Sequence, residues 1–261
     1  MLQIGDVQLG HVPRVVLSVC GDSALLRCAA WEGVDLIEAR VDQFRRLDVP
    51  SVARDVRAIA RHGLPVIGTV RSHQEGGRAE LKDTQRLALF AALVPVVDAV
   101  DVELGSPSIL AEVIALTRRH RKTLLVSSHH FTDTPPDSVL EGVLERARSL
   151  RADLVKIAAF ARRPHDVERL LRFTFRHKAR HLVTIAMGAQ GTISRLVFPL
   201  AGSLLTYTHV SPSMGQIPLR AFVKGLRLCY PDYEAALLRR RRALERRPAT
   251  IGERCGVRGV R

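Results

Sequence analysis

Short runs of valine, isoleucine and leucine recur along the chain at intervals of roughly 20 to 33 residues. Each run has the length of a β-strand. An apolar run without polar alternation is typical of a parallel strand that is buried on both faces. The runs cover residues 15–19, 34–37, 66–70, 97–102, 124–126, 154–157, 182–185 and 203–207.

Longer segments with helical spacing of their apolar residues separate these runs. They include residues 51–61, 81–93, 107–120, 137–150 and 165–175. Eight strand–helix units in about 250 residues predict an α/β fold, the (β/α)8 TIM barrel. The competing architecture is a doubly wound open sheet. Such a sheet would usually have about six strands and, if it bound a dinucleotide, a glycine-rich first turn, and neither is found.

The first residues of the chain have a different pattern. Residues 2–9 alternate apolar and polar side chains around Gly5 and Asp6. Such alternation about a glycine-containing turn predicts a β-hairpin. We expect this N-terminal hairpin to close the bottom of the barrel.

The size of the chain suits one domain, which we place at residues 1–238, followed by a basic, flexible tail at 239–261. The tail holds nine of the Arg residues and two Glu residues, so it carries about half of the net charge of +14. RNA-recognition and zinc-finger sequences are absent, and three Tyr and one Trp offer little stacking surface for bases. We therefore expect no specific nucleic-acid partner, whereas a positive field would attract a small anionic substrate.

Membrane insertion and secretion are not expected either. The longest apolar run, residues 87–97, has 11 residues and contains Pro95, so it is too short to span a bilayer. No basic region followed by a long apolar stretch occurs near residue 1. We expect a cytoplasmic protein.

One lysine lies within an apolar strand. Lys156 sits in the run 154–157, where a charged side chain is costly unless it is paired or neutral. It could form a structural ion pair with Glu38 or Glu103. Alternatively, it could act as a neutral amine that attacks a ketone or aldehyde, because burial favours the uncharged form of lysine. His129, one strand earlier, favours the second interpretation, since imine formation needs a proton shuttle.

Polar residues at the carboxyl ends of several predicted strands form an ordered set, and in a barrel such positions are the first candidates for catalysis. The set is Glu38-x-Arg40-x-Asp42, Arg71-x-x-x-Glu75-Gly76-Gly77, Asp101-x-Glu103-Leu104, Ser127-x-His129, Lys156-Ile157-Ala158, Ile193-Ser194-Arg195-Leu196 and Gly215-Gln216. In order and spacing it resembles type I 3-dehydroquinate dehydratase, over residues 15–219. The resemblance implies a (β/α)8 barrel and a homodimer, with no metal and no cofactor. It implies a lyase that dehydrates 3-dehydroquinate to 3-dehydroshikimate, in the shikimate pathway to chorismate and the aromatic amino acids.

The resemblance also implies roles for individual residues. Lys156 would form the Schiff base, and His129 would donate and accept the protons. Glu75 would orient His129 and favour its charged form. The substrate-binding residues would be Ser18, Glu38, Arg40, Arg71, Arg195, Ser213 and Gln216. Among these, Arg195 would bind the substrate carboxylate, for which a planar guanidinium is suited.

The chain departs from the family pattern at two places. His130 stands where an Asp or Asn usually follows the catalytic histidine. Pro212-Ser213-Met214 precede Gly215-Gln216, where the family has Ser-Ala-Pro, so the substrate-binding serine would be Ser213 or Ser211, or would be missing.

Two other functions are weighed against this one. The first is another metal-independent Schiff-base lyase or aldolase, and the Arg195 and Gly215-Gln216 motifs favour the dehydratase over it. The second is a catalytically silent barrel that binds polyanions through the arginine tail. The joint presence of Lys156, His129 and Glu75 speaks against that second function.

Overall fold

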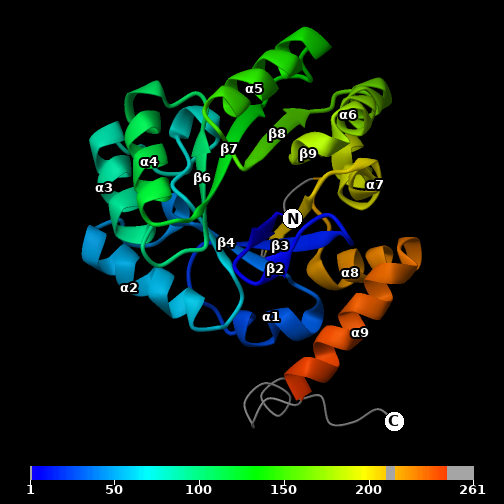
Figure 1. Cartoon of the computed structure of the whole chain (residues 1–261), viewed down its shortest axis with the longest axis horizontal. Helices are drawn as coiled ribbons and strands as arrows, with labels where there is room; N and C mark the ends of the chain where they lie inside the picture. Colours follow the sequence, from blue (N-terminus) through cyan, green and yellow to red (C-terminus); the bar gives the residue numbers. More distant parts are fainter. Residues whose placement is uncertain (1, 210–214, 246–261) are drawn as a thin grey trace.

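The fold, in a computed structural model that describes residues 2–209 and 215–245, is a ring of parallel strands surrounded by helices (Figure 1). The strands of the ring are β3 (Arg14–Val19), β4 (Leu36–Arg40), β5 (Val66–Thr69), β6 (Ala99–Glu103), β7 (Thr123–His130), β8 (Leu154–Phe160), β9 (Leu182–Met187) and β10 (Leu205–His209). Neighbours in space follow the order β10-β3-β4-β5-β6-β7-β8-β9, every ladder is parallel, and the sheet curls into a nearly closed barrel. The predicted (β/α)8 barrel is confirmed.

The described part of the chain has nine α-helices, which lie outside the ring of strands (Figure 1). They are α1 (Leu26–Glu32), α2 (Val49–Ala60), α3 (Asp83–Leu93), α4 (Pro107–Arg119), α5 (Asp137–Ser149), α6 (Pro164–Arg176), α7 (Ser194–Ala201), α8 (Leu219–Cys229) and α9 (Pro231–Glu245). The five helices predicted from spacing are confirmed to within two residues at each end. None of the described helices has the length and apolar character that crossing a membrane requires.

The N-terminal hairpin is also present. Strands β1 (Gln3–Ile4) and β2 (Val7–Gln8) pair antiparallel around Gly5, whose φ of 56° is easily adopted by glycine. Ile4 and Leu9 are buried among the apolar side chains inside the barrel. The hairpin therefore covers the amino ends of the ring strands, as predicted.

The barrel interior changes character along its axis because alternate residues of each strand point inward. Near the amino ends, the inward side chains form an apolar layer of Val16, Leu36, Ile67, Ala99, Leu125, Leu154, Val183 and Leu205. Two residues further along each of seven strands, the inward side chains are Ser18, Glu38, Thr69, Asp101, Ser127, Lys156 and Tyr207, all of them buried. The apolar floor thus supports a polar layer toward the carboxyl ends.

The chain end differs from the prediction. We expected a flexible tail from residue 239, but α9 continues to Glu245, and the boundary at 238 lies inside this helix. Arg240 explains why: its guanidinium donates to the Val34 carbonyl at 3.0 Å and to Asp35 Oδ1 at 2.7 Å. Residues 246–261 lie outside the described part of the chain.

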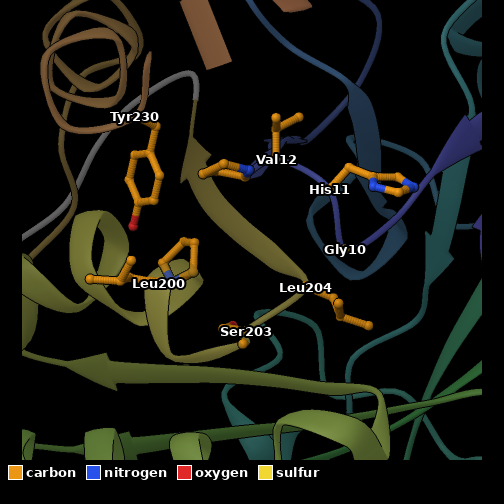
Figure 2. A pocket seen from close by; sticks show the side chains of 10 residues that line it. Gly10, His11, Val12, Leu200, Ser203, Leu204 and Tyr230 are labelled. Carbon is orange, nitrogen blue, oxygen red and sulfur yellow. The ribbon is translucent and has the colours of Figure 1, made fainter. Parts of the chain in front are cut away.

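A hollow of about 210 Å³ lies beside the amino ends of β3 and β10 (Figure 2). Its walls come from residues 10–13, the end of α7 and Tyr230. His11 is the only imidazole among the lining residues, which include no carboxylate, lysine or arginine. The hollow is therefore poorly equipped for acid–base chemistry, in contrast with the opposite end of the barrel.

Candidate active site

Lys156 lies in the polar layer of the barrel, on β8, and is 4% exposed. Its Nζ donates to Asp101 Oδ2 at 3.0 Å and to Glu38 Oε1 at 3.3 Å. The ion pair with Glu38 is one of the two that the sequence allowed. The other, with Glu103, is wrong, because the Glu103 carboxylate is held by two arginines instead.

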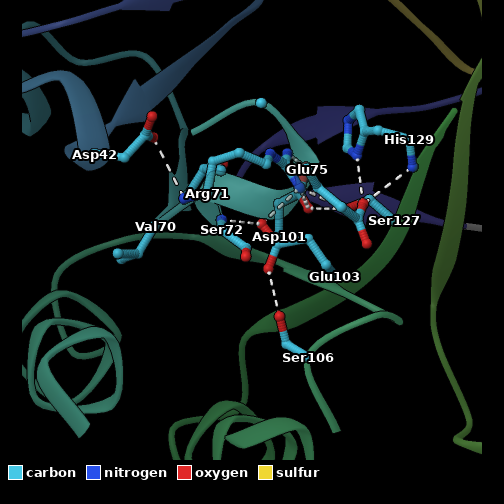
Figure 3. Close-up of polar contacts among 12 residues, drawn as sticks. Asp42, Val70, Arg71, Ser72, Glu75, Asp101, Glu103, Ser106, Ser127 and His129 are labelled. Carbon is cyan, nitrogen blue, oxygen red and sulfur yellow. Dashed lines mark hydrogen bonds and ion pairs between the residues drawn. The ribbon is translucent and has the colours of Figure 1, made fainter. Parts of the chain in front are cut away.

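Arg71, which follows β5, connects the acidic residues of β6 (Figure 3). Its Nη2 donates to Asp101 Oδ2 at 2.8 Å, and its Nη1 lies 3.0 Å from Glu103 Oε1 and 2.7 Å from Ser127 Oγ. Burial alone would lower the pKa of Arg71, but the Asp101 and Glu103 carboxylates raise it above its usual value. Arg71 is therefore a fixed positive charge at the base of the site.

Arg86 is a buried partner that sequence reasoning missed. It reaches in from α3, is 1% exposed, and its Nη2 lies 2.5 Å from Glu103 Oε2. The same guanidinium donates to the Val70 carbonyl at 3.1 Å and 3.2 Å. The available signal was its spacing of three and four residues from Leu89 and Phe90, which puts it on the buried face of α3, where an arginine requires an acidic partner.

The buried charges in the cluster around Lys156 balance one another. Three carboxylates, on Glu38, Asp101 and Glu103, face three cations, on Arg71, Arg86 and Lys156. Such balance is needed because an unpaired buried charge costs several kcal/mol.

Ser18 and Glu38 lie together on adjacent strands. Ser18 Oγ donates to Glu38 Oε2 at 2.5 Å, and Thr69 Oγ1 donates to Oε1 at 3.2 Å. Burial by itself raises the pKa of Glu38, but the Lys156 ammonium opposes this and the net direction is downward. Both oxygens of the Glu38 carboxylate therefore accept hydrogen bonds.

His129 faces the barrel mouth and contacts Glu75 (Figure 3). Oε2 of Glu75 lies 2.9 Å from His129 Nδ1 and accepts the backbone N–H of His129 at 3.0 Å. Because Oε2 is the acceptor of the backbone N–H, we assign the ring proton to Nδ1, which leaves Nε2 to act on a bound molecule. In the β7–β8 ladder, His129 is one inward position beyond Ser127, the residue paired with Lys156.

The protonation states of this pair differ from the expectation. Burial, followed by the nearby cations Arg71 and Lys156, lowers the pKa of His129 well below its usual value. Burial, followed by the charge of Glu103, raises the pKa of Glu75 to about 7. Glu75 therefore does not hold His129 in the charged form, because the local field favours a neutral imidazole.

His130 points the opposite way. Its Nε2 lies 3.2 Å from Ser128 Oγ, on the other face of β7. Only one of the two adjacent histidines therefore faces the mouth, as strand alternation requires.

Arg40 follows Glu38 on the same inward face of β4. Its guanidinium makes two hydrogen bonds of 3.0 Å to Asp42 and one of 3.4 Å to the Gly76 carbonyl. Asp42 also accepts the backbone N–H groups of Arg71 and Arg78. This carboxylate therefore ties Arg40 to the loop that carries Glu75.

Arg195 is a buried guanidinium of a different kind. It lies on α7, is 7% exposed, and donates from Nη1 to the Ala186 carbonyl at 3.3 Å. Its Nε has no hydrogen-bond partner, and no carboxylate of the described residues pairs with it. Burial lowers the pKa of Arg195 to about 10. Among the described residues, Arg195 therefore lacks the kind of carboxylate partner that Arg71 and Arg86 have.

The remaining predicted residues lie after β10. Ser213 falls outside the described part of the chain, as does Ser211. Gln216 is half-buried. It follows Gly215, whose φ is 82° and where a Cβ would lie 2.4 Å from the Gly188 carbonyl oxygen. Gln216 is therefore brought to the carboxyl end of β9.

Comparison with known proteins identifies the family. The model of the type I 3-dehydroquinase family matches residues 14–232. The chain belongs to this family of hydro-lyases. It is 34% identical over 219 residues to 3-dehydroquinate dehydratase of Thermodesulfovibrio yellowstonii, covering 82% of this chain and 95% of that protein. It is 36% identical over 226 residues to the Methanosarcina barkeri enzyme of the same name, covering 84% and 93%.

A solved structure agrees with the sequence comparisons. The 3-dehydroquinate dehydratase of Geobacillus kaustophilus superposes with a TM-score of 0.79 at 30% identity, covering 87% of this chain and 95% of that one. The chain therefore shares both its fold and part of its sequence with that enzyme.

Proposed function

We propose that the protein dehydrates 3-dehydroquinate to 3-dehydroshikimate through a Schiff base on Lys156. The observation that carries the proposal is the placement of Lys156 and His129 on adjacent strands. Both side chains point into the barrel, and His129 lies one inward position nearer the mouth. A ketone bound there meets an amine on one side and an imidazole beside it.

The first stage forms the imine. The neutral imidazole of His129 accepts a proton from the Lys156 ammonium, and the freed amine attacks the ketone carbon to give a carbinolamine. His129 then returns that proton to the carbinolamine hydroxyl, which leaves as water, so that a protonated imine is formed. Glu38 and Asp101 remain beside the new cation and stabilise its charge, as they stabilise the lysine.

The second stage is the elimination. The protonated imine withdraws electrons, so the adjacent C–H becomes acidic enough for the neutral Nε2 of His129 to remove its proton. The enamine then expels the hydroxyl on the next carbon, and His129 returns a proton to it, releasing water. Hydrolysis of the imine frees the product and Lys156, so that the net change is the loss of one water.

Arg195 supports an anionic substrate. It is buried, incompletely hydrogen-bonded and without a carboxylate partner among the described residues. A substrate carboxylate would supply the missing acceptor and would accept two parallel hydrogen bonds from the guanidinium. We infer that the ring hydroxyls contact Ser18, Glu38, Arg40, Arg71, Gln216 and Ser213.

Covalent chemistry is also consistent with one relative. The type I 3-dehydroquinate dehydratase of Clostridium difficile, 27% identical with a TM-score of 0.79, was solved with covalently modified comenic acid. We further propose that this chain works as a cytoplasmic homodimer in the shikimate pathway to aromatic amino acids.

Steady-state turnover of 3-dehydroquinate by the Lys156→Ala variant tests the proposal. We expect no measurable turnover from a variant that retains the wild-type circular dichroism spectrum. Lys224→Ala, which removes an exposed lysine of α8, is the matched control and should turn over normally. Near-normal turnover by Lys156→Ala would refute the Schiff-base assignment, and a wild-type protein inactive on 3-dehydroquinate would refute the substrate.

A further inference from the structure

Tyr207 lies against Lys156 inside the barrel, but the mechanism above leaves it unused. It comes from β10 and is 6% exposed. The Nζ of Lys156 lies 4.3 Å from the centroid of its ring. A cation at this distance over an aromatic face is attracted by the negative potential of the ring.

The hydroxyl of Tyr207 is buried and makes no hydrogen bond with the described residues. An unsatisfied buried hydroxyl is destabilising, and a phenylalanine at the same position would avoid that cost. Burial and the charges of Glu38 and Asp101 raise the pKa of Tyr207 well above its usual value, so the hydroxyl keeps its proton and remains a donor. A buried donor with no acceptor among the described residues points to an acceptor that a ligand supplies.

The ring of Tyr207 can also stabilise the positive charge after the nitrogen of Lys156 has become part of an imine. An ammonium has three N–H donors and reaches both Glu38 and Asp101. A protonated imine retains one N–H, so it can keep only one of those two hydrogen bonds. The attraction to the face of Tyr207 needs no N–H and persists through the change.

We propose that Tyr207 is a further substrate-contacting residue, whose ring stabilises the positive charge on Lys156 Nζ and whose hydroxyl donates a hydrogen bond to an oxygen of the substrate joined to that nitrogen. The proposal rests on the proposed function, because it takes the ligand to be an oxygen-rich ketone. It separates two contributions, one from the aromatic face and one from the hydroxyl.

Three variants separate these contributions. Tyr207→Phe keeps the ring and removes the hydroxyl, and Tyr207→Leu removes both. Tyr230→Phe is the matched control, because its hydroxyl donates to the Leu196 carbonyl at 2.6 Å, outside the site. For each variant the thermal midpoint without ligand and kcat/KM for 3-dehydroquinate are measured.

We expect Tyr207→Phe to be as stable as the wild type or more stable, with kcat/KM lowered roughly 3- to 10-fold. Tyr207→Leu should lose a further factor of about 3 to 30. Tyr230→Phe should lose stability and keep its kcat/KM. A rise in stability together with a loss of activity is the result that a purely structural tyrosine would not produce.

Normal kcat/KM in Tyr207→Phe, or a loss of stability matching that of Tyr230→Phe, would overturn the role of the hydroxyl. Equal kcat/KM in Tyr207→Leu and Tyr207→Phe would overturn the role of the ring. Wild-type protein without turnover would refute the proposed function instead. In that case the thermal midpoint of Tyr207→Phe alone tests whether the hydroxyl serves a ligand. A lower midpoint than that of the wild type would overturn this role, and a higher midpoint would support it.

Discussion

The side chains around Lys156 divide into residues that hold charge and residues suited to moving protons. Burial alone would raise the pKa of Asp101, but Arg71 and Lys156 reverse this and keep it ionised. Glu75 and His129 behave differently, because burial shifts both toward their neutral forms. A carboxyl whose pKa is raised to about 7 can exchange a proton near neutral pH, and a neutral imidazole can accept one, so this pair is suited to proton transfer.

At the same scale, the two adjacent histidines give opposite expectations. General acid–base help is worth about 10² to 10⁴ in rate, so His129→Ala should lose turnover on that scale and accumulate a covalent adduct on Lys156. His130→Ala should lose far less, because its ring lies on the other face of the strand. Turnover and intact-mass spectrometry of both variants check this, and an equal or larger loss at His130 would contradict the assignment.

Glu75 gives a prediction for both stability and activity. Its pKa is raised from 4.5 to about 7, so the folded state resists its ionisation. The associated stability is fully present below pH 4.5 and is lost as the pH rises through 7. At pH 8, Glu75→Gln should therefore be more stable than the wild type, on the order of 1 to 3 kcal/mol, with no difference near pH 4.

The activity of Glu75→Gln should move in the other direction. An ionised Glu75 strengthens His129 as a base, so wild-type kcat/KM should rise as the pH passes about 7. Glu75→Gln should lack this rise and should lose at least about 10-fold in kcat/KM at pH 8. Urea unfolding and pH–rate profiles provide the measurements, and a variant that keeps the rise would show that another group titrates.

At the scale of elements, α9 packs against α1 and α8 near the amino ends of the strands, away from the site. Its residue Tyr233 donates to the Gly33 carbonyl at 3.2 Å, and Arg240 bonds the residues that precede β4. These contacts lie at the opposite end of the strands from Lys156. The helix therefore serves stability, and the chemistry is carried by the loops and strand ends at the other side.

Arg240→Ala tests whether α9 contributes to stability without affecting catalysis. The substitution removes two hydrogen bonds, while Asp35 keeps Arg14 at 3.1 Å and the Val15 N–H at 2.8 Å. We expect a loss of about 1–2 kcal/mol in the free energy of unfolding, with kcat/KM unchanged. The exposed neighbour Arg239→Ala is the control and should change neither quantity. Lower kcat/KM in a fully folded Arg240→Ala protein would connect α9 to the site.

At the scale of the whole molecule, the barrel was predictable because its signals are local. Uninterrupted apolar runs occur eight times, segments with helical spacing lie between them, and each inward position of a strand follows from alternation. The partners of the buried charges were less predictable. Asp101 rather than Glu103 pairs with Lys156, because Arg86 reaches in from α3 and engages Glu103. That choice depends on the reach of a side chain from a distant element, which spacing does not encode.

The protonation state of His129 likewise could not be predicted from the sequence. Glu75 beside His129 suggested an imidazolium, but burial and the cations Arg71 and Lys156 favour the neutral ring. Desolvation depends on the assembled barrel rather than on any one neighbour. The α9 boundary failed for a similar reason, since Arg240 finds its partners some 200 positions earlier in the chain.

Borohydride trapping tests the central claim, the covalent imine on Lys156, most directly. Wild-type protein is mixed with 3-dehydroquinate and borohydride, then examined by intact-mass spectrometry and peptide mapping. The account predicts one reduced adduct on the peptide that contains Lys156, none without substrate, and none in Lys156→Ala. Active protein that yields no adduct, or an adduct on another lysine, would contradict it.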